Sequence, residues 1–240
     1  MIVGGLDGCR GGWILATLTW ESERDDQVST GAIRSDVAVD KLSTFAEAIA
    51  LVRSGALLAL GVDMPIGLPD SGQREADRAA RRRLGRRRSS VFPTPVRSTL
   101  QSVDYADALA RSRAIDGRGL SKQAFNLLPR IIEVDELMTP ALQSKVFECH
   151  PETCFATLAG HSLTTVKRHA DGLAERNALL SSVLGDVTTF SNHPPTGSKP
   201  DDVLDALVIA TVAKRFLAGN VERLGDGSID RRGLRMEIVV

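Results

Sequence analysis

The chain has 240 residues, of which 42% are hydrophobic and 25% are charged, and its formal net charge at pH 7 is zero. This length is enough for one large domain or two small ones with a sizeable core, and the composition is typical of a globular protein. The sequence contains no apolar run of about 18 residues, and no basic segment precedes an apolar one near its start. We therefore expect neither a membrane-spanning helix nor a signal peptide.

The first part of the chain predicts a mixed sheet. Residues 2–7 and 13–19 favour two strands joined by a glycine turn as a hairpin, and a weaker third strand is expected near 29–34. Apolar positions at helical spacing predict a helix over 37–53. The continuous apolar run 57–65 is typical of a buried central strand.

The remaining elements are mostly helical. A fifth short strand is expected within 146–152, and the tail 236–240 is expected to add one more. Pro129 must start, kink or break the helix around it. Helices are predicted at 71–84, 102–116, 121–138, 151–160, 172–184 and 200–218. This order predicts a single α/β domain over 1–240, with an Arg-rich helical insertion at about 71–140 after the fourth strand.

The three cysteines, Cys9, Cys149 and Cys154, are odd in number and widely spaced. They do not resemble a disulfide framework, so we expect a reducing, cytoplasmic setting. A zinc site formed by these cysteines with His150 is disfavoured because there is no CxxC pair. A Cys149–His150 nucleophilic dyad is also disfavoured, because adjacent strand residues point to opposite faces.

Acidic side chains stand at the ends of several predicted elements. Asp7 ends the first strand and Asp63 ends the buried strand. If these strands are parallel neighbours, both carboxylates emerge at the sheet edge where ligands bind in open α/β sheets. The first turn of the last long helix adds an acidic cluster whose spacing of three or four lets its members share a face. The candidate catalytic and metal-binding residues are Asp7, Asp63, Glu148, Asp202 and Asp205.

Grouped carboxylates predict a bound cation. In a low-dielectric cleft they repel one another, and each carries a desolvation cost. A divalent ion offsets both effects, and hard oxygen ligands favour Mg²⁺ or Mn²⁺. Two such ions about 4 Å apart clamp the attacking and leaving oxygens in phosphodiester hydrolysis. The pattern therefore predicts a two-metal site in which Asp7 is a bridging ligand.

Each acid also has a purely structural interpretation. Asp7 can cap the glycine turn, and Asp63 can be a turn residue after its strand. Glu148 can be a surface acid, and Asp201 or Asp202 can be a helix N-cap. The joint pattern, rather than any single residue, carries the metal-site prediction.

Charge is unevenly distributed along the chain. The window 74–97 contains nine arginines and two acidic residues, a local charge of +7 that the rest of the chain balances. A basic stripe on an otherwise acidic protein favours an anionic partner. The alternative is a solvated helix face whose arginines form surface ion pairs.

Seven stretches, in this order along the chain, resemble the family of unknown function DUF429. They are GLDGCRGGW, GVDMPIGLP, RRRLGRRRSSVFPTPVR, SKQAFNLLPRIIEVDELM, VFECHPETCF, DGLAERNALL and DDVLDALVIA. The family is described as predicted nucleases with an RNase H-like fold. The resemblance implies an α/β protein whose RNase H-like mixed five-stranded sheet is flanked by helices.

The wider RNase H-like superfamily, which includes Holliday-junction resolvases, carries one acid on the first strand, one on the fourth and one or two on the last helix. By that likeness Asp7, Asp63, Asp202 and Asp205 match the metal-binding set, and Glu148 is an extra or substitute ligand. The fourth-strand residue is often Glu in the superfamily, whereas Asp63 is shorter. The shorter reach shifts the metal position or passes this ligand role to Glu148.

The resemblance also suggests that the Arg-rich stretch is a phosphate-contacting arm beside the site. Arg10, inside the glycine turn, is expected to reach the scissile phosphate or, alternatively, to pair with Asp63 or Glu148. The candidate substrate-binding residues are Arg10, Arg88, Arg97 and Lys167, with Ser89, Ser90 and Arg176 as further candidates.

We therefore expect a cytoplasmic nuclease, a hydrolase that cleaves phosphodiester bonds in nucleic acid with Mg²⁺ or Mn²⁺. One alternative is a nucleic-acid-binding module of the same fold without catalysis. The other is a phosphotransfer or ATP-using relative. That class needs two such lobes around a nucleotide, and 240 residues leave room for one.

Overall fold

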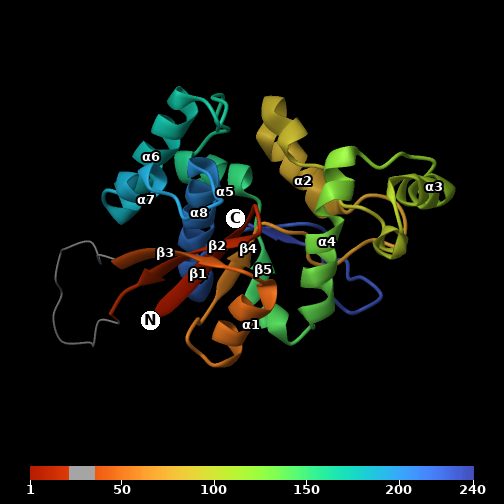
Figure 1. Ribbon diagram of the computed structural model, residues 1–240, viewed down its shortest axis with the longest axis horizontal. Helices are drawn as coiled ribbons and strands as arrows, with labels where there is room; N and C mark the ends of the chain where they lie inside the picture. Colours follow the sequence, from red (N-terminus) through yellow and green to blue (C-terminus); the bar gives the residue numbers. More distant parts are fainter. Residues whose placement is uncertain (22–35) are drawn as a thin grey trace.

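The structure is a computed structural model that describes residues 1–21 and 36–240. Its main strands are β1 (Ile2–Cys9), β2 (Gly12–Thr19), β3 (Asp36–Leu42), β4 (Leu60–Val62) and β5 (Val146–Glu148). They form one sheet in the order β3-β2-β1-β4-β5 (Figure 1). β1, β2 and β3 pair antiparallel, whereas β4 is parallel to both β1 and β5. The expected mixed sheet of five strands is confirmed.

The third strand replaces the first part of an expected helix. The helix predicted over 37–53 is wrong at its start, because β3 pairs with residues 13–19 of β2. Val37 and Val39 pack on the core and alternate with exposed neighbours, which is the period of two that a strand requires. The strand expected near 29–34 lies outside the described residues.

Helices cover both faces of the sheet (Figure 1). One face carries α8 (Pro200–Leu217), around which α5 (Pro151–Ala159), α6 (Ala170–Leu184) and α7 (Thr188–Asn192) pack. The opposite face carries α1 (Phe45–Arg53) and α4 (Lys122–Leu137). Neighbouring side chains of β2 point to opposite faces of the sheet. Ile14 lies in the core under α8, and Leu15 lies in the core under α1 and α4.

The segment between β4 and β5 forms the helical insertion. It contains α2 (Glu75–Leu84), the 3₁₀ turns η1 (Gly85–Ser90) and η2 (Arg97–Gln101), α3 (Tyr105–Asp116), α4 and the 3₁₀ turn η3 (Leu142–Ser144). Pro129 lies inside α4, and the helix continues past it to Leu137. The predicted helices of this segment are therefore present, without a break at the proline.

The end of the chain forms a small second sheet. β6 (Arg223–Leu224) and β7 (Ile238–Val239) pair antiparallel, so the strand expected in the tail is confirmed and its edge partner is β6. Among residues 1–21 and 36–240, no helix combines the length and the apolar character needed to cross a membrane.

Gly5 lets α8 pack directly on β1. A Cβ at this position would lie 2.1 Å from the carbonyl oxygen of Ala206 and 2.3 Å from the amide nitrogen of Ala210. We expect Gly5→Ala to lower the free energy of unfolding by about 1–3 kcal/mol, because only movement of the helix relieves the clash. Urea denaturation measures this, with Gly119→Ala as control, since there an added Cβ meets only the side chain of Leu109 at 3.2 Å. Equal losses in the two variants would contradict the prediction.

Candidate active site

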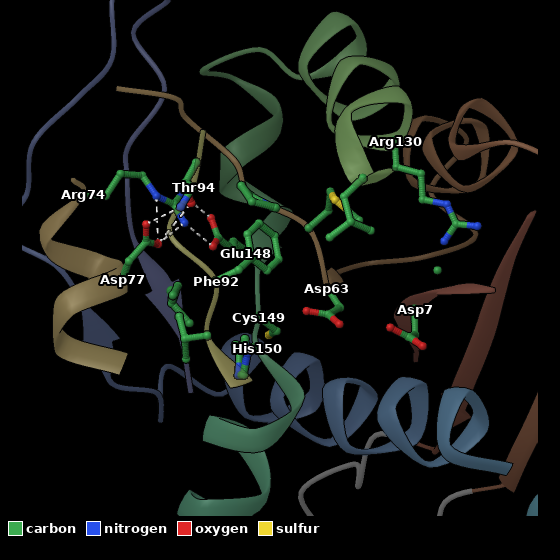
Figure 2. Close-up of a pocket in the computed structure, with 16 residues that line it drawn as sticks. Asp7, Asp63, Arg74, Asp77, Phe92, Thr94, Arg130, Glu148, Cys149 and His150 are labelled. Carbon is green, nitrogen blue, oxygen red and sulfur yellow. Dashed lines mark hydrogen bonds and ion pairs between the residues drawn. The ribbon is translucent and has the colours of Figure 1, made fainter. Parts of the chain in front are cut away.

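Two carboxylates meet where neighbouring parallel strands end. β1 and β4 pair with Leu6 opposite Val62, so Asp7 and Asp63 are the next residues along each strand. The amide of Asp63 donates to the carbonyl of Leu6 at 2.9 Å, which holds the end of β4 against β1. Figure 2 shows both carboxylates at the same end of a pocket. The two side chains are thus neighbours at the sheet edge, as expected from the parallel strands.

A third carboxylate, Asp205, joins them from α8, the helix that packs on Gly5. Burial raises the pKa of Asp7 well above its ordinary value, and the charges of Asp63 and Asp205 raise it further, while Lys167 lowers it. Burial likewise raises the pKa of Asp205 to about 7, although Lys167 opposes the rise. The three acids are therefore close together, and the neighbouring charges disfavour the ionised forms of Asp7 and Asp205.

The chemistry of this cluster fits a hard cation. Oδ2 of Asp205 accepts a hydrogen bond from the ammonium of Lys167, whereas Oδ1 is buried without a partner. A buried carboxylate oxygen without a partner is costly, and a divalent ion would satisfy it. Within the described part of the chain, no three His, Cys, Asp or Glu side chains already surround one point as metal ligands do. An ion would therefore have to draw the carboxylates of Asp7, Asp63 and Asp205 together, and these are the residues that would hold it.

The other acids of the last helix point elsewhere. The carboxylate of Asp202 accepts from the backbone N–H of Lys199 at 2.9 Å and so caps the start of α8. Asp201 pairs with Arg168 at 3.2 Å. The structural interpretation therefore accounts for Asp202, and Asp205 is the member of this group that lies with Asp7 and Asp63.

Glu148 belongs to a buried ion-pair network. Its two oxygens accept from the two terminal nitrogens of Arg74, each at 2.7 Å, and the backbone N–H of Ile66 adds a bond of 2.8 Å. Arg74 also bonds Asp77, whose carboxylate accepts in turn from the backbone and hydroxyl of Thr94. The expectation that Glu148 is a metal ligand is therefore corrected, because its oxygens are already occupied by a cation and an amide.

Asp7, Asp63 and this network line one pocket that opens to solvent (Figure 2). Asp7 and Asp63 lie at one end and Arg74 at the other. The wall between them includes Phe92 and His150.

Two of the predicted phosphate-binding arginines are on the surface. Arg10 is exposed in the turn between β1 and β2, and Glu148, one of its alternative partners, is held by Arg74 instead. Arg88 is exposed in η1. It lines a surface groove with Gln73, Arg78, Arg81, Arg82 and Gly85.

Two other arginines expected near a phosphate are buried in ion pairs, which corrects both expectations. Nη1 of Arg97 donates to Asp135 at 2.8 Å, and Nη2 donates to Asp230. Arg176 is fully buried and donates to both oxygens of Glu152, at 2.8 and 3.0 Å. Because these guanidiniums hold the fold together from inside, they are not available to a substrate.

All three cysteines are buried and free. Burial raises the pKa of the Cys9 thiol, and it raises that of Cys149 well above the ordinary value. A raised pKa disfavours the thiolate that zinc binding and nucleophilic attack both require. The raised pKa values therefore disfavour both a zinc site and a nucleophilic role for these two thiols.

The sequence matches the model of a known family over most of its length. That family is described as a protein of unknown function (DUF429), and its model matches residues 5–228. The chain belongs to the DUF429 family. Among curated proteins, no sequence matches it.

Two solved structures are similar to this DUF429 chain over most of its length. One is Thermus thermophilus RuvC, at 13% identity and a TM-score of 0.38, covering 92% of this chain and 98% of that one. The other is T. thermophilus RuvC in complex with a Holliday junction substrate, at 14% identity and a TM-score of 0.38, covering 92% of this chain and 97% of that one.

Arg130 is a pocket residue of this DUF429 chain that the sequence did not predict. It extends from α4 to the end of β1, where its Nη2 donates to the carbonyl of Cys9. Its guanidinium lies 5.2 Å from the ring centroid of Trp13. A Cβ on Gly8 would lie 1.9 Å from Nη1 of Arg130, so the glycine beside Asp7 makes room for this side chain. The glycine turn indicated that some group packs closely against this backbone, but nothing in the sequence indicated that the group is Arg130.

Proposed function

We propose that this protein is a nuclease that hydrolyses phosphodiester bonds in nucleic acid with Mg²⁺ or Mn²⁺. The observation that carries the proposal is that Asp7 and Asp63, at the ends of β1 and β4, line one solvent-open pocket, and that Asp205 of α8 is close enough to raise the pKa of Asp7. Buried carboxylates with raised pKa values mark candidate functional sites. We further propose that residues 1–240 form one domain around this site.

The residues have distinct roles in this proposal. Asp7, Asp63 and Asp205 hold the ion, and a bound Mg²⁺ or Mn²⁺ would act as a Lewis acid on the phosphodiester and lower the pKa of the attacking water. Arg130, whose guanidinium lies beside Gly8 at the same end of the pocket, orients a phosphate oxygen. The ion-paired wall around Arg74 keeps the pocket open and rigid. Arg88 and its neighbours in the surface groove bind the nucleic-acid backbone away from the reacting bond.

The groove supports a second candidate, a nucleic-acid-binding module without catalysis. Four arginines line it, and Arg78 and Arg82 share one acidic partner, Glu75. One carboxylate cannot neutralise two guanidiniums, so the groove keeps positive charge for a polyanion.

A cleavage panel tests the two candidates. Labelled single strands, duplexes, RNA–DNA hybrids and a four-way junction are incubated with the protein in Mg²⁺, Mn²⁺ or EDTA. The nuclease proposal expects cleavage of at least one substrate with metal and none in EDTA. Binding without cleavage under every condition would favour the binding module. Cleavage that persists in EDTA would contradict the metal-dependent proposal.

Arg130→Gln is expected to lower kcat/KM by about 10–100-fold, mostly through KM. Hydrogen bonds to charged groups contribute about 1.5–3 kcal/mol, and this arginine is the pocket's candidate phosphate donor. Steady-state kinetics on the substrate found in the panel measure the change. Arg113→Gln, at an exposed arginine of α3, is the control for loss of general positive charge. Equal effects of the two changes would remove Arg130 from the proposed site.

A further inference from the structure

A lysine stands among the three carboxylates. The ammonium of Lys167 pairs with Oδ2 of Asp205, whose side chain is 1% exposed, while the lysine side chain is 31% exposed. The charge of Asp205 raises the pKa of Lys167 most, burial opposes the rise, and Asp7 and Asp63 add to it. Lys167 therefore pairs directly with the carboxylate that packs beside Asp7 and Asp63, and it brings one positive charge to the cluster.

The loop between α5 and α6 is built to hold this lysine. Its backbone packs on Gly172, where a Cβ would lie 2.0 Å from the carbonyl oxygen of Val166 and 3.2 Å from Cα of Lys167. The next residue, Arg168, pairs with Asp201 on the first turn of α8 at 3.2 Å. The loop is thus tied on one side to α6 and on the other to the helix that carries Asp205. This double attachment sets where the ammonium enters the cluster.

The charges of the cluster specify how many ions it needs. When Asp7, Asp63 and Asp205 are ionised, the three carboxylates and one ammonium sum to −2, which a single divalent cation neutralises. We propose that the Lys167 ammonium takes the place of a second metal ion, so that the site binds one divalent cation. This inference rests on the proposed metal site and replaces the two-ion arrangement that the sequence pattern predicts.

Metal stoichiometry tests the inference without reference to activity. Calorimetric titration with Mn²⁺, together with the EPR signal of free Mn²⁺, counts the ions bound per chain. We expect one ion for the wild type and for Lys167→Arg, which keeps the charge. We expect two ions for Lys167→Met, which removes the ammonium and leaves three carboxylates. Lys145→Met, at an exposed lysine before β5, controls for loss of surface charge and is expected to bind one ion.

The outcomes separate this inference from the proposed function. Two ions in the wild type would overturn the role of Lys167 and leave the metal-dependent nuclease standing. A single ion in Lys167→Met, at any affinity, would also overturn it. If neither the wild type nor Lys167→Met binds Mn²⁺, the proposed metal site itself fails. Circular dichroism of each variant confirms that the chain titrated is folded.

Discussion

Asp7→Asn is expected to lower the kcat of metal-dependent cleavage by about 10²–10³-fold. Asp7 lies at the centre of the carboxylate cluster, because both Asp63 and Asp205 act on its pKa. A metal acting as a Lewis acid supplies several kcal/mol of transition-state stabilisation, and each 1.4 kcal/mol corresponds to about tenfold in rate. The amide keeps the shape of the side chain but loses the negative charge that holds the ion.

The same change is expected to stabilise the metal-free protein. The raised pKa of Asp7 means that the folded chain holds this proton to higher pH than the unfolded chain does. The contribution of this proton to the free energy of unfolding is fully present below the ordinary pKa of 3.8 and is lost as the pH rises through the raised folded value. In EDTA, the free energy of unfolding of Asp7→Asn should therefore exceed that of the wild type by an amount that grows as the pH increases above about 4.

Urea denaturation at a series of pH values measures this gain, and the cleavage panel measures the loss of activity. Asp40→Asn, at an exposed position of β3, is the matched control and is expected to change neither quantity. A folded Asp7→Asn protein that cleaves at the wild-type rate would remove Asp7 from the metal site. A loss of stability in place of a gain would show that the carboxylate serves the fold.

Removing one partner of the Arg74–Glu148 pair is expected to cost about 3–5 kcal/mol of unfolding free energy. Both side chains are buried, and breaking such a pair leaves an uncompensated charge in the interior. Burial lowers the pKa of Arg74, but Asp77 and Glu148 raise it by more, so the guanidinium stays charged. Arg74→Met removes the cation that holds both carboxylates and Glu148→Gln removes one of its anions.

Chemical denaturation measures the loss of unfolding free energy. Mn²⁺ titration of the folded variant shows whether Glu148 is also a metal ligand. If Glu148 only supports the wall of the pocket, Glu148→Gln binds Mn²⁺ as the wild type does. A folded Glu148→Gln protein with wild-type stability and lost Mn²⁺ binding would restore Glu148 to the ligand set. Glu136→Gln, at an exposed position of α4, is the control and is expected to leave both properties unchanged.

Local patterns in the sequence were enough to predict the frame of the site. The glycine turn after an apolar run predicts the hairpin of β1 and β2, and an apolar run that ends in an acid predicts β4 and Asp63. These signals are local, because they depend on side-chain period and on turn chemistry within a few residues. The parallel order of β1 and β4 then brings Asp7 and Asp63 together, since strand ends share one edge of a sheet.

Local patterns were misleading where the apolar residues of a strand and of the following helix together fit a helical spacing. Val39, Leu42 and Phe45 are spaced as on a helix, and this predicts a helix through a region whose first part is a strand. The capping box of Thr44 and Glu47 marks the true start of α1 and is visible in the sequence. Pairing with β2 decided between the two forms, and pairing is a tertiary interaction.

The partners that charged side chains find far away along the chain were decided by the tertiary structure alone. Arg74 meets Glu148 across 74 positions, Arg130 meets Cys9 across 121, and Lys167 meets Asp205 across 38. Composition shows how many arginines and acids there are, but charge attraction does not depend on separation along the chain. Only the packing of α2, α4 and the loop before α6 on the sheet determines which carboxylates stay free for a metal ion and which are neutralised within the protein.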